Sequence, residues 1–261
     1  IDYYDGLGRP VQSVVTGSNT STGYEYRLQS YDYVDRIAKQ FITAYGNGTP
    51  EFKDSANLSW LYSDVDKSTR YQYDGLGRVT TKRGPGNLWR NGNHYNQTAY
   101  RINSVGEVRL FSISGNSLKQ TNNASHAQGT LTKDVYDDEN GNEMRVYKDL
   151  YDRVVLERRI NDNTAYDTYY VYDNLGNLRY VLPPMATDNL PTSGTWTMAT
   201  SALKKYAYYY EYDSRGRCTK KQMPGCDYIT MTYDNNDRLV ASQDGNQRNA
   251  SPVTSTYYEY D

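Results

Sequence analysis

Few residues of this sequence have the types and spacing that catalysis or metal binding requires. The two histidines, His94 and His126, stand far apart in stretches that we predict to be loops. They are either a metal or catalytic pair or two separate surface histidines. Cys218 and Cys226 lack metal-type spacing, and they fit structural or free thiols better than a disulfide. Zinc-helix, nucleophile-elbow and phosphate-loop motifs do not occur. We therefore expect no catalytic residue, no metal site and no cofactor.

Carboxylates are abundant, so residue types alone do not exclude a glycosidase-like Asp/Glu pair. Most of the aspartates, however, belong to a repeated turn motif described below. The stretch DDENGNE at 137–143 resembles a calcium-binding loop, but Tyr136 would then occupy the first ligand position, which favours a turn. A carbohydrate-active enzyme is thus the weakest of the functional hypotheses.

Sugar binding is a second hypothesis, because aromatic rings stack on sugars and Asn and Asp form hydrogen bonds with them. The candidate contacts are Trp60, Trp89 and Trp196. The alternative is that these tryptophans anchor loops on the sheet. Binding residues should be exposed in a shared groove, whereas anchors should be buried separately.

The composition predicts a folded chain that uses tyrosine as its main core residue. Mean hydropathy is −0.90, yet the net charge is only −2, and the 261 residues include 30 Tyr against 3 Phe. Tyrosine suits half-buried sheet surfaces because its ring is apolar and its hydroxyl can reach water. A pI of about 5.8 without a stripe of Lys and Arg argues against nucleic-acid binding. No apolar run is long enough to span a membrane.

A short turn motif, Asp-x-x-(Gly/Asp)-(Arg/Asn), recurs along the chain, first as YDGLGR at 4–9 and again at 73–78. Its first, fourth and fifth positions are Asp5, Gly8 and Arg9; Asp32, Asp35 and Arg36; Asp74, Gly77 and Arg78; Asp138, Gly141 and Asn142; Asp149, Asp152 and Arg153; Asp173, Gly176 and Asn177; Asp213, Gly216 and Arg217; and Asp234, Asp237 and Arg238. A type I turn favours Asp first and Gly fourth. The fourth residue then takes positive φ, which Gly adopts freely and Asp tolerates. The motif therefore predicts hairpin turns followed by a bulge.

This turn also predicts the register of each hairpin. The Asp should face the residue four positions later, and one step outward Tyr73 should face Val79. The same rule pairs Tyr172 with Leu178 and Tyr233 with Leu239. Tyr71, Tyr170 and Tyr210 then lie on that face, because strand side chains alternate. We expect this Tyr and aliphatic face to be buried and the opposite face to be charged or polar.

The predicted fold is all-β, a curved or spiralling sheet of antiparallel hairpins that forms an arc of a shell, with minor helical inserts. We expect one continuous array of repeats over residues 1–261, a fragment that is cut within a repeat at both ends. Loop inserts are predicted near 44–69, 84–100 and 183–206, with a short helix within 196–207.

The turn motif, preceded by Tyr and repeated at irregular spacing, resembles that of the RHS/YD-repeat family. The stretch YVLPPMA and the inserts are similar to the Bacteroides type of RHS protein. The resemblance implies a β-sheet that spirals into a hollow shell. Bacterial members can enclose a variable C-terminal toxin, and the related teneurins act in cell adhesion. The self-cleaving boundary and the toxin domain of the family are not found in this sequence.

The resemblance implies a structural role in a secreted or surface-exposed bacterial protein. The expected partners are the remaining repeats and a C-terminal effector of the same polypeptide, which the shell encloses or presents. The alternative is an adhesive surface module that binds carbohydrate.

Overall fold

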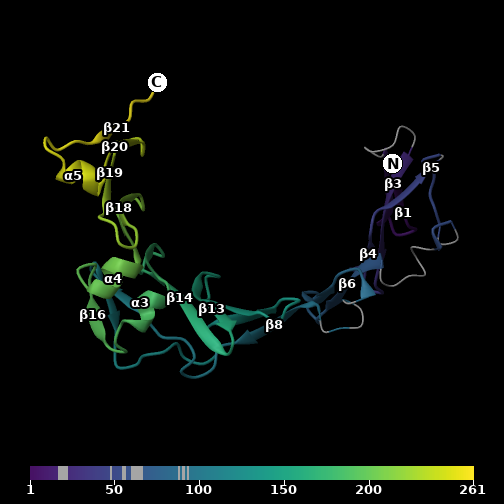
Figure 1. The fold of residues 1–261 in the computed structure, drawn as a ribbon, viewed down its shortest axis with the longest axis horizontal. Coiled ribbons are helices and arrows are strands. Elements are labelled where there is room, and N and C mark those ends of the chain that lie inside the picture. The colour runs from purple at the N-terminus through teal and green to yellow at the C-terminus, as the bar shows by residue number, and fades with distance from the viewer. Residues whose placement is uncertain are drawn as a thin grey trace. The chain divides into compact units, whose positions relative to one another are not determined.

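The computed structural model describes residues 1–16, 23–47, 49–54, 57–59, 67–87, 89, 92 and 94–261. These residues form two compact units. Unit 1 comprises residues 1–99 and 135–143, and unit 2 comprises residues 100–134 and 144–261. Strands dominate both units (Figure 1), and their pairing is that of antiparallel hairpins. The predicted all-β class is therefore confirmed.

The elements follow the chain as a series of short strands with three short helices in the described part. Unit 1 contains β1 (Asp2–Tyr4), β2 (Pro10–Thr16), β3 (Gly23–Tyr31), β4 (Ile37–Phe41), β5 (Ala44–Asn47), β6 (Ser68–Tyr73) and β7 (Val79–Arg83). The boundary between the units falls within β8 (Asn96–Ile102), β11 (Thr132–Asp137) and β12 (Glu143–Lys148). Unit 2 contains β9 (Ser112–Ser114), β10 (Ser117–Gln120), β13 (Val154–Asn161), β14 (Thr164–Tyr172), β15 (Leu178–Leu182), α3 (Pro184–Asp188), β16 (Gly194–Trp196), α4 (Ser201–Tyr206), β17 (Tyr208–Tyr212), β18 (Cys218–Gln222), β19 (Ile229–Tyr233), β20 (Leu239–Gln243), α5 (Gly245–Asn249) and β21 (Thr256–Tyr257).

The hairpins have the register that the turn motif predicts. Tyr73 is the cross-strand partner of Val79, and the equivalent pairs of the other two hairpins are also present. The register shifts next to each of these tyrosines, between Gln72 and Tyr73 in the first hairpin. This shift is the bulge that the left-handed fourth residue of the turn produces.

The insert between β15 and β17 contains the helix that the sequence predicts, but it is shorter than expected. The helix α4 begins at Ser201, because Gly194–Trp196 form the strand β16, which pairs with β10. It packs against α3 (Figure 1). The helices of the described ranges run for five or six residues, far less than a bilayer crossing requires.

The core of unit 2 lies on the sheet face that the sequence analysis expected to be charged or polar. Tyr169 and Val171 are each 4% exposed, whereas their neighbours Tyr170 and Tyr172 are half-buried. The prediction was wrong because both faces of β14 are apolar. Which face becomes buried is decided by the inserts that cover it.

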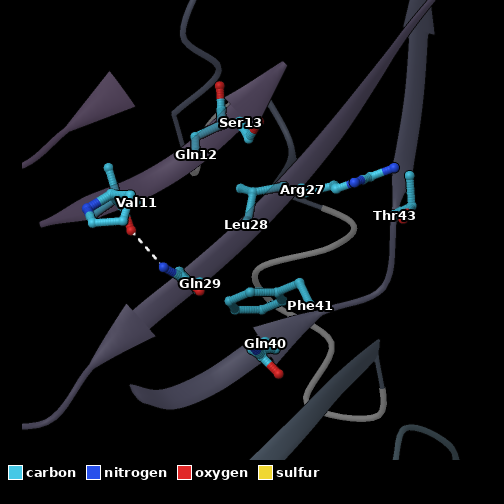
Figure 2. A pocket seen from close by; sticks show the side chains of 10 residues that line it. Val11, Gln12, Ser13, Arg27, Leu28, Gln29, Gln40, Phe41 and Thr43 are labelled. Atoms are coloured by element: carbon cyan, nitrogen blue, oxygen red, sulfur yellow. Dashed lines mark hydrogen bonds between the residues drawn. The ribbon is translucent and has the colours of Figure 1, made fainter. Parts of the chain in front are cut away.

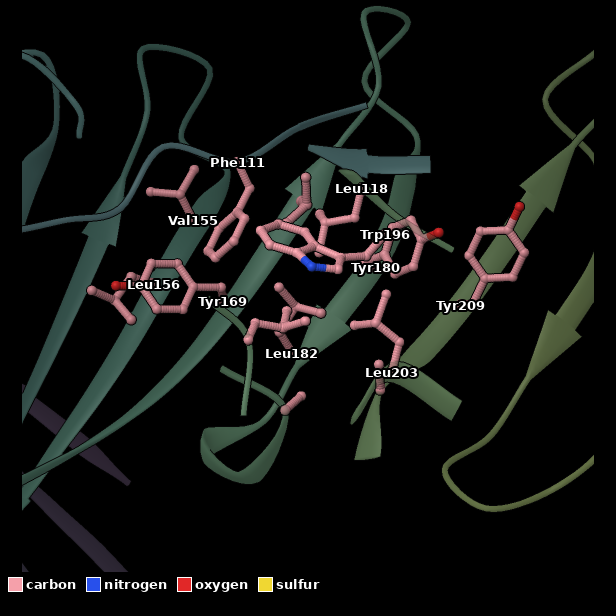
Figure 3. Close-up of a cluster of buried hydrophobic side chains, with 14 of the residues drawn as sticks. Phe111, Leu118, Val155, Leu156, Tyr169, Tyr180, Leu182, Trp196, Leu203 and Tyr209 are labelled. Carbon is pink, nitrogen blue, oxygen red and sulfur yellow. The ribbon is translucent and has the colours of Figure 1, made fainter. Parts of the chain in front are cut away.

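Side chains from these inserts complete the core of unit 2. Phe111, Leu118, Trp196 and Leu203 come from the segments after β8 and β15 (Figure 3). They pack on a layer of sheet residues, which comprises Leu156, Tyr169, Val171, Tyr180, Leu182 and Tyr209. Burial of a large apolar side chain contributes roughly 1.5–3 kcal/mol, so the inserts supply much of the stability of this unit.

Unit 1 has a smaller core around β3. This strand pairs with β2 along one side, and along the other with β5 through Gly23–Tyr26 and with β4 through Gln29–Tyr31. The core residues are Val14, Tyr26, Leu28, Ala44 and Leu58. The Gln12 amide is buried next to them; it donates to the carbonyl of Lys53 and accepts from its N–H, both at 2.9 Å.

Candidate functional site

The aspartate of each turn motif organises its own turn. In the 74–78 copy, the Asp74 N–H donates to the Arg78 carbonyl at 3.0 Å, and the Gly77 N–H donates to the Asp74 carbonyl at 3.1 Å. The Asp74 carboxylate accepts the N–H groups of Leu76 and Arg78, both at 2.9 Å, and the Arg78 Nε–H at 2.8 Å. The other seven copies form the same two backbone hydrogen bonds.

These hydrogen bonds favour the charged form of the carboxylates. The Arg9 side chain, followed by its backbone N–H, lowers the pKa of Asp5 below its usual value. At Asp138 the donor is Asn142 instead, whose side chain and backbone N–H lower the pKa in the same way. A general acid must hold a proton near neutral pH, so these aspartates are suited to structure and not to proton transfer.

The fourth residue of every turn lies in the left-handed region. The φ values are +76° for Gly8, +68° for Asp35, +79° for Gly77, +81° for Gly141, +59° for Asp152, +85° for Gly176, +77° for Gly216 and +64° for Asp237. A Cβ atom built on Gly77 would meet no atom within 4 Å. The demand for glycine at this position is therefore conformational and not steric.

The three turns with Asp at the fourth position gain an ion pair from it. Arg9 binds the Asp35 carboxylate, which belongs to the next turn along the chain. Arg217 donates to Asp237 at 2.7 Å, again from one turn to the next. The third, Asp152, pairs with Lys148 at 3.2 Å. Asp35 and Asp237 thus each link two turns in a way that glycine cannot.

At several turns, the tyrosine before the Asp joins one repeat to the preceding one. The Tyr73 hydroxyl donates to the carbonyl of Ile37 at 2.7 Å, and its ring lies under the Arg36 guanidinium at 4.5 Å. Arg36 also donates to the Asp74 carbonyl at 3.2 Å. We call this arrangement, in which Tyr contacts the Arg and the following carbonyl of the preceding turn, the repeat junction.

Five repeat junctions occur among the described residues. The Tyr, Arg and carbonyl residues are Tyr31, Arg9 and Pro10; Tyr73, Arg36 and Ile37; Tyr172, Arg153 and Val154; Tyr233, Arg217 and Cys218; and Tyr260, Arg238 and Leu239. The hydroxyl–carbonyl distances are 2.7–3.0 Å. A hydrogen bond and a cation–π contact together contribute roughly 1–2 kcal/mol per junction. The recurrence of Tyr before the Asp and Arg after it is the signal that could have revealed the junction from sequence.

A buried ion pair fastens the insert between β8 and β11 to the sheet of unit 2. The Glu107 carboxylate of this insert pairs with Lys133 and accepts the Tyr147 hydroxyl at 2.8 Å. Burial by itself would raise the pKa of Glu107, but the hydrogen bonds from Lys133, the Ser104 N–H and Tyr147 lower it to about 2. The same burial and the Glu107 hydrogen bond raise the pKa of Tyr147.

The two histidines lie in different units. In unit 1, a ring nitrogen of His94 is 3.0 Å from the Glu139 carbonyl. In unit 2, burial lowers the pKa of His126. The thiols of Cys218 and Cys226 are both free. Within the described ranges, no group of three or more His, Cys, Asp or Glu is arranged to hold a metal ion.

The tryptophans that the sequence analysis named as glycan contacts differ in their surroundings. Trp196 is 8% exposed in the core of unit 2, which is what a loop anchor requires. Trp89, in unit 1, is half-buried, and its ring lies 3.1 Å from where a Cβ of Gly84 would be. Trp60 is outside the described residues.

Unit 1 also has an open depression of about 370 Å³ where β3 changes partner from β5 to β4 (Figure 2). Gln29 lies at its wall and donates to the Pro10 carbonyl at 2.8 Å. Its charged lining residue, Arg27, pairs with Glu25 at 3.4 Å. The described residues that line it include no Asp, Glu or His, so they offer no acid–base pair.

Comparisons with known proteins find solved structures of a similar fold. Residues 1–102 match a family described as a domain of unknown function, DUF6443. No curated protein matches the chain in sequence. The crystal structure of TcdB2–TccC3 superposes with a TM-score of 0.58 at 13% identity, over 93% of this chain and 11% of that chain. The Photorhabdus luminescens Tc holotoxin pore with a mutated TccC3 gives 0.54 at 12% identity, with the same coverage.

This match shows a common fold. The resemblance to the RHS/YD-repeat family is confirmed at the level of the fold. The chain spans 11% of the length of the solved chains that it matches.

Proposed function

We propose that this chain is a section of the wall of a β-shell, which encloses or presents a C-terminal toxin or effector of the same polypeptide. The larger protein is then a secreted or surface-exposed bacterial RHS protein. The observation that carries the proposal is the repeat junction, because it recurs in both units and couples a hairpin to the preceding one through the same contacts each time. Such coupling can build a continuous wall from single hairpins, each of which cannot bury a core alone.

The chemistry of the turns supports a structural role and not a catalytic one. Each motif carboxylate accepts hydrogen bonds from backbone N–H groups of its own turn. The Tc toxin structures, which contain TccC3 as a component, support the shell through their common fold.

The test is protection of the C-terminal region from protease in the full-length protein. Native protein is digested, and C-terminal peptides are followed by mass spectrometry. Protection that lasts until the repeats are denatured supports enclosure. Immediate cleavage of the C-terminal region, while the repeats persist, contradicts it.

A matched control separates enclosure from general resistance to protease. A version with a flexible protease-sensitive linker before the C-terminal region should remain protected if the shell is closed around that region. The same linker placed outside the shell, at the N-terminus, should be cut at once.

A further inference from the structure

Three basic side chains from separate segments meet on one face of the sheet in unit 1. Lys39 of β4 is the cross-strand partner of Arg70 of β6, and Arg70 is the partner of Arg83 of β7. Directly opposed residues of antiparallel strands share a face, with Cβ atoms about 4.5–5.5 Å apart, and like charges in this position repel. Arg70 and Arg83 belong to one hairpin, but Lys39 comes from a distant segment, so the charge pattern of the chain did not predict this cation row.

Two members of the cation row lack a counter-charge. The Nε atom of Arg70 is buried and has no hydrogen-bond partner. Within the described part of the chain, neither Lys39 nor Arg70 forms an ion pair or a side-chain hydrogen bond. A buried donor without a partner costs about 1–3 kcal/mol unless a ligand satisfies it.

The third member, Arg83, has contacts that fix its position. Arg83 donates to the Trp89 carbonyl at 3.2 Å, and its guanidinium lies over the Tyr95 ring at 4.3 Å. These contacts help to orient the guanidinium. The row therefore presents two unpaired cations next to a fixed one.

Two buried cations on the sheet of unit 2 are paired with carboxylates of neighbouring segments. In unit 2, Lys133 pairs with Glu107 of the insert that crosses the sheet, and Arg158 binds Asp167 through two hydrogen bonds of 2.7 Å. We propose that the row of Lys39, Arg70 and Arg83 binds the carboxylates of an acidic polypeptide segment, which lies on the sheet as the insert does in unit 2. The row would bind such a segment whether or not the chain forms a shell wall.

The dimensions and charge of the chain favour a polypeptide over other anions. Three neighbouring strands span about 10 Å, which is more than one small oxyanion covers. An extended acidic segment places side chains of one face about 7 Å apart, so two carboxylates reach the row together. A nucleic acid would also supply several anions, but the net charge of −2 disfavours so dense a polyanion.

Binding of a labelled decaglutamate peptide to the 261-residue chain tests the proposal, with fluorescence anisotropy as the readout. A decaglutamine peptide and inorganic phosphate serve as comparison probes. The test variant is Lys39→Gln with Arg70→Gln. The matched control is Lys204→Gln with Lys205→Gln, which removes the same charge from two exposed residues of α4 in unit 2.

We expect decaglutamate to bind the natural chain and the control variant equally, and the test variant at least about tenfold more weakly, which corresponds to about 1.4 kcal/mol. If both variants lose the same affinity for decaglutamate, net charge alone explains the effect, and the proposal is overturned. If phosphate at the same concentration of charge displaces the peptide, the ligand is a small oxyanion and not a polypeptide, and the proposal is overturned. Absence of binding to the natural chain also overturns it.

A stability measurement separates a binding role from a structural one. Arg70→Gln removes an unpaired buried donor and a like-charge contact, so the melting temperature of the free chain should rise while peptide binding is lost. A fall in melting temperature would assign Arg70 to the fold and contradict the proposal. Lys39→Gln alone, at a half-buried position, provides the binding test should the double variant not fold.

Discussion

The requirement for positive φ at the fourth position of the turn can be measured within a single turn. Gly75 and Gly77 belong to the same copy of the motif, and a Cβ atom on either would meet no atom within 4 Å. They differ in backbone conformation, because Gly77 has φ of +79° and Gly75 does not lie in the left-handed region. The two glycines thus form a natural pair of test and control.

Gly77→Val should destabilise the chain by about 1–3 kcal/mol, the range for a residue held in a disfavoured backbone region. A β-branched side chain is at the upper end, since it resists positive φ most. Gly75→Val should change stability by no more than about 0.5 kcal/mol, as for an ordinary exposed position. Gly77→Asp should lie between the two, because Asp occupies the same position at φ of +68° in Asp35 and +64° in Asp237.

The assay is urea denaturation followed by circular dichroism, with the midpoints of the three variants compared with that of the natural chain. The expected order of stability is Gly75→Val, Gly77→Asp, Gly77→Val. Equal midpoints for the two valine variants would refute the argument that conformation, and not space, selects glycine at the fourth position. A lower midpoint for the aspartate variant than for Gly77→Val would contradict the role assigned to aspartate.

Three further predictions concern the junctions and the core. Tyr172→Phe removes the hydroxyl of a repeat junction and should lower the free energy of unfolding by roughly 0.5–1.5 kcal/mol, whereas Tyr166→Phe, at a 45% exposed position of the same strand, should have little effect in the same urea titration. The pKa of Glu107 falls from 4.5 to about 2 on folding, so its ion pair contributes fully above pH 4.5 and is lost as the pH falls toward 2. In the Glu107→Gln variant, the melting temperature should therefore fall less steeply with pH over this interval. An unchanged slope of melting temperature against pH would show that the ion pair is not its cause. Gly194→Ala should lower the melting temperature and alter tryptophan fluorescence, because its Cβ would lie 2.7 Å from a ring atom of Trp196; an unchanged spectrum would contradict this packing.

The repeated motif predicts much of the fold because its information is local. Asp and Gly four positions apart specify the turn, and the turn specifies the pairing of Tyr73 with Val79. The contacts between repeats were not predicted, although the residues that form them belong to the same motif. A hairpin rule pairs residues within one hairpin and does not say which neighbouring turn a Tyr or an Arg reaches.

The inserts of unit 2 show where sequence patterns fail. The helix α4 was expected within 196–207, but Trp196 belongs to β16, since pairing with β10 stabilises a strand there. Glu107 carried no local signal of its role either. Its partner Lys133 is brought to it only when the insert folds over the sheet.

By itself, the sequence determined the turns, the hairpin register and the use of tyrosine in place of aliphatic residues, because each depends on the conformational preferences and alternation of neighbouring residues. Only the tertiary structure decided which face of β14 is buried, since both faces are apolar and the covering side chains come from distant inserts. It also decided that Lys39 of β4 lies next to the hairpin pair of Arg70 and Arg83. Cross-strand pairing between distant segments creates such neighbours, and the charge pattern along the chain does not record it.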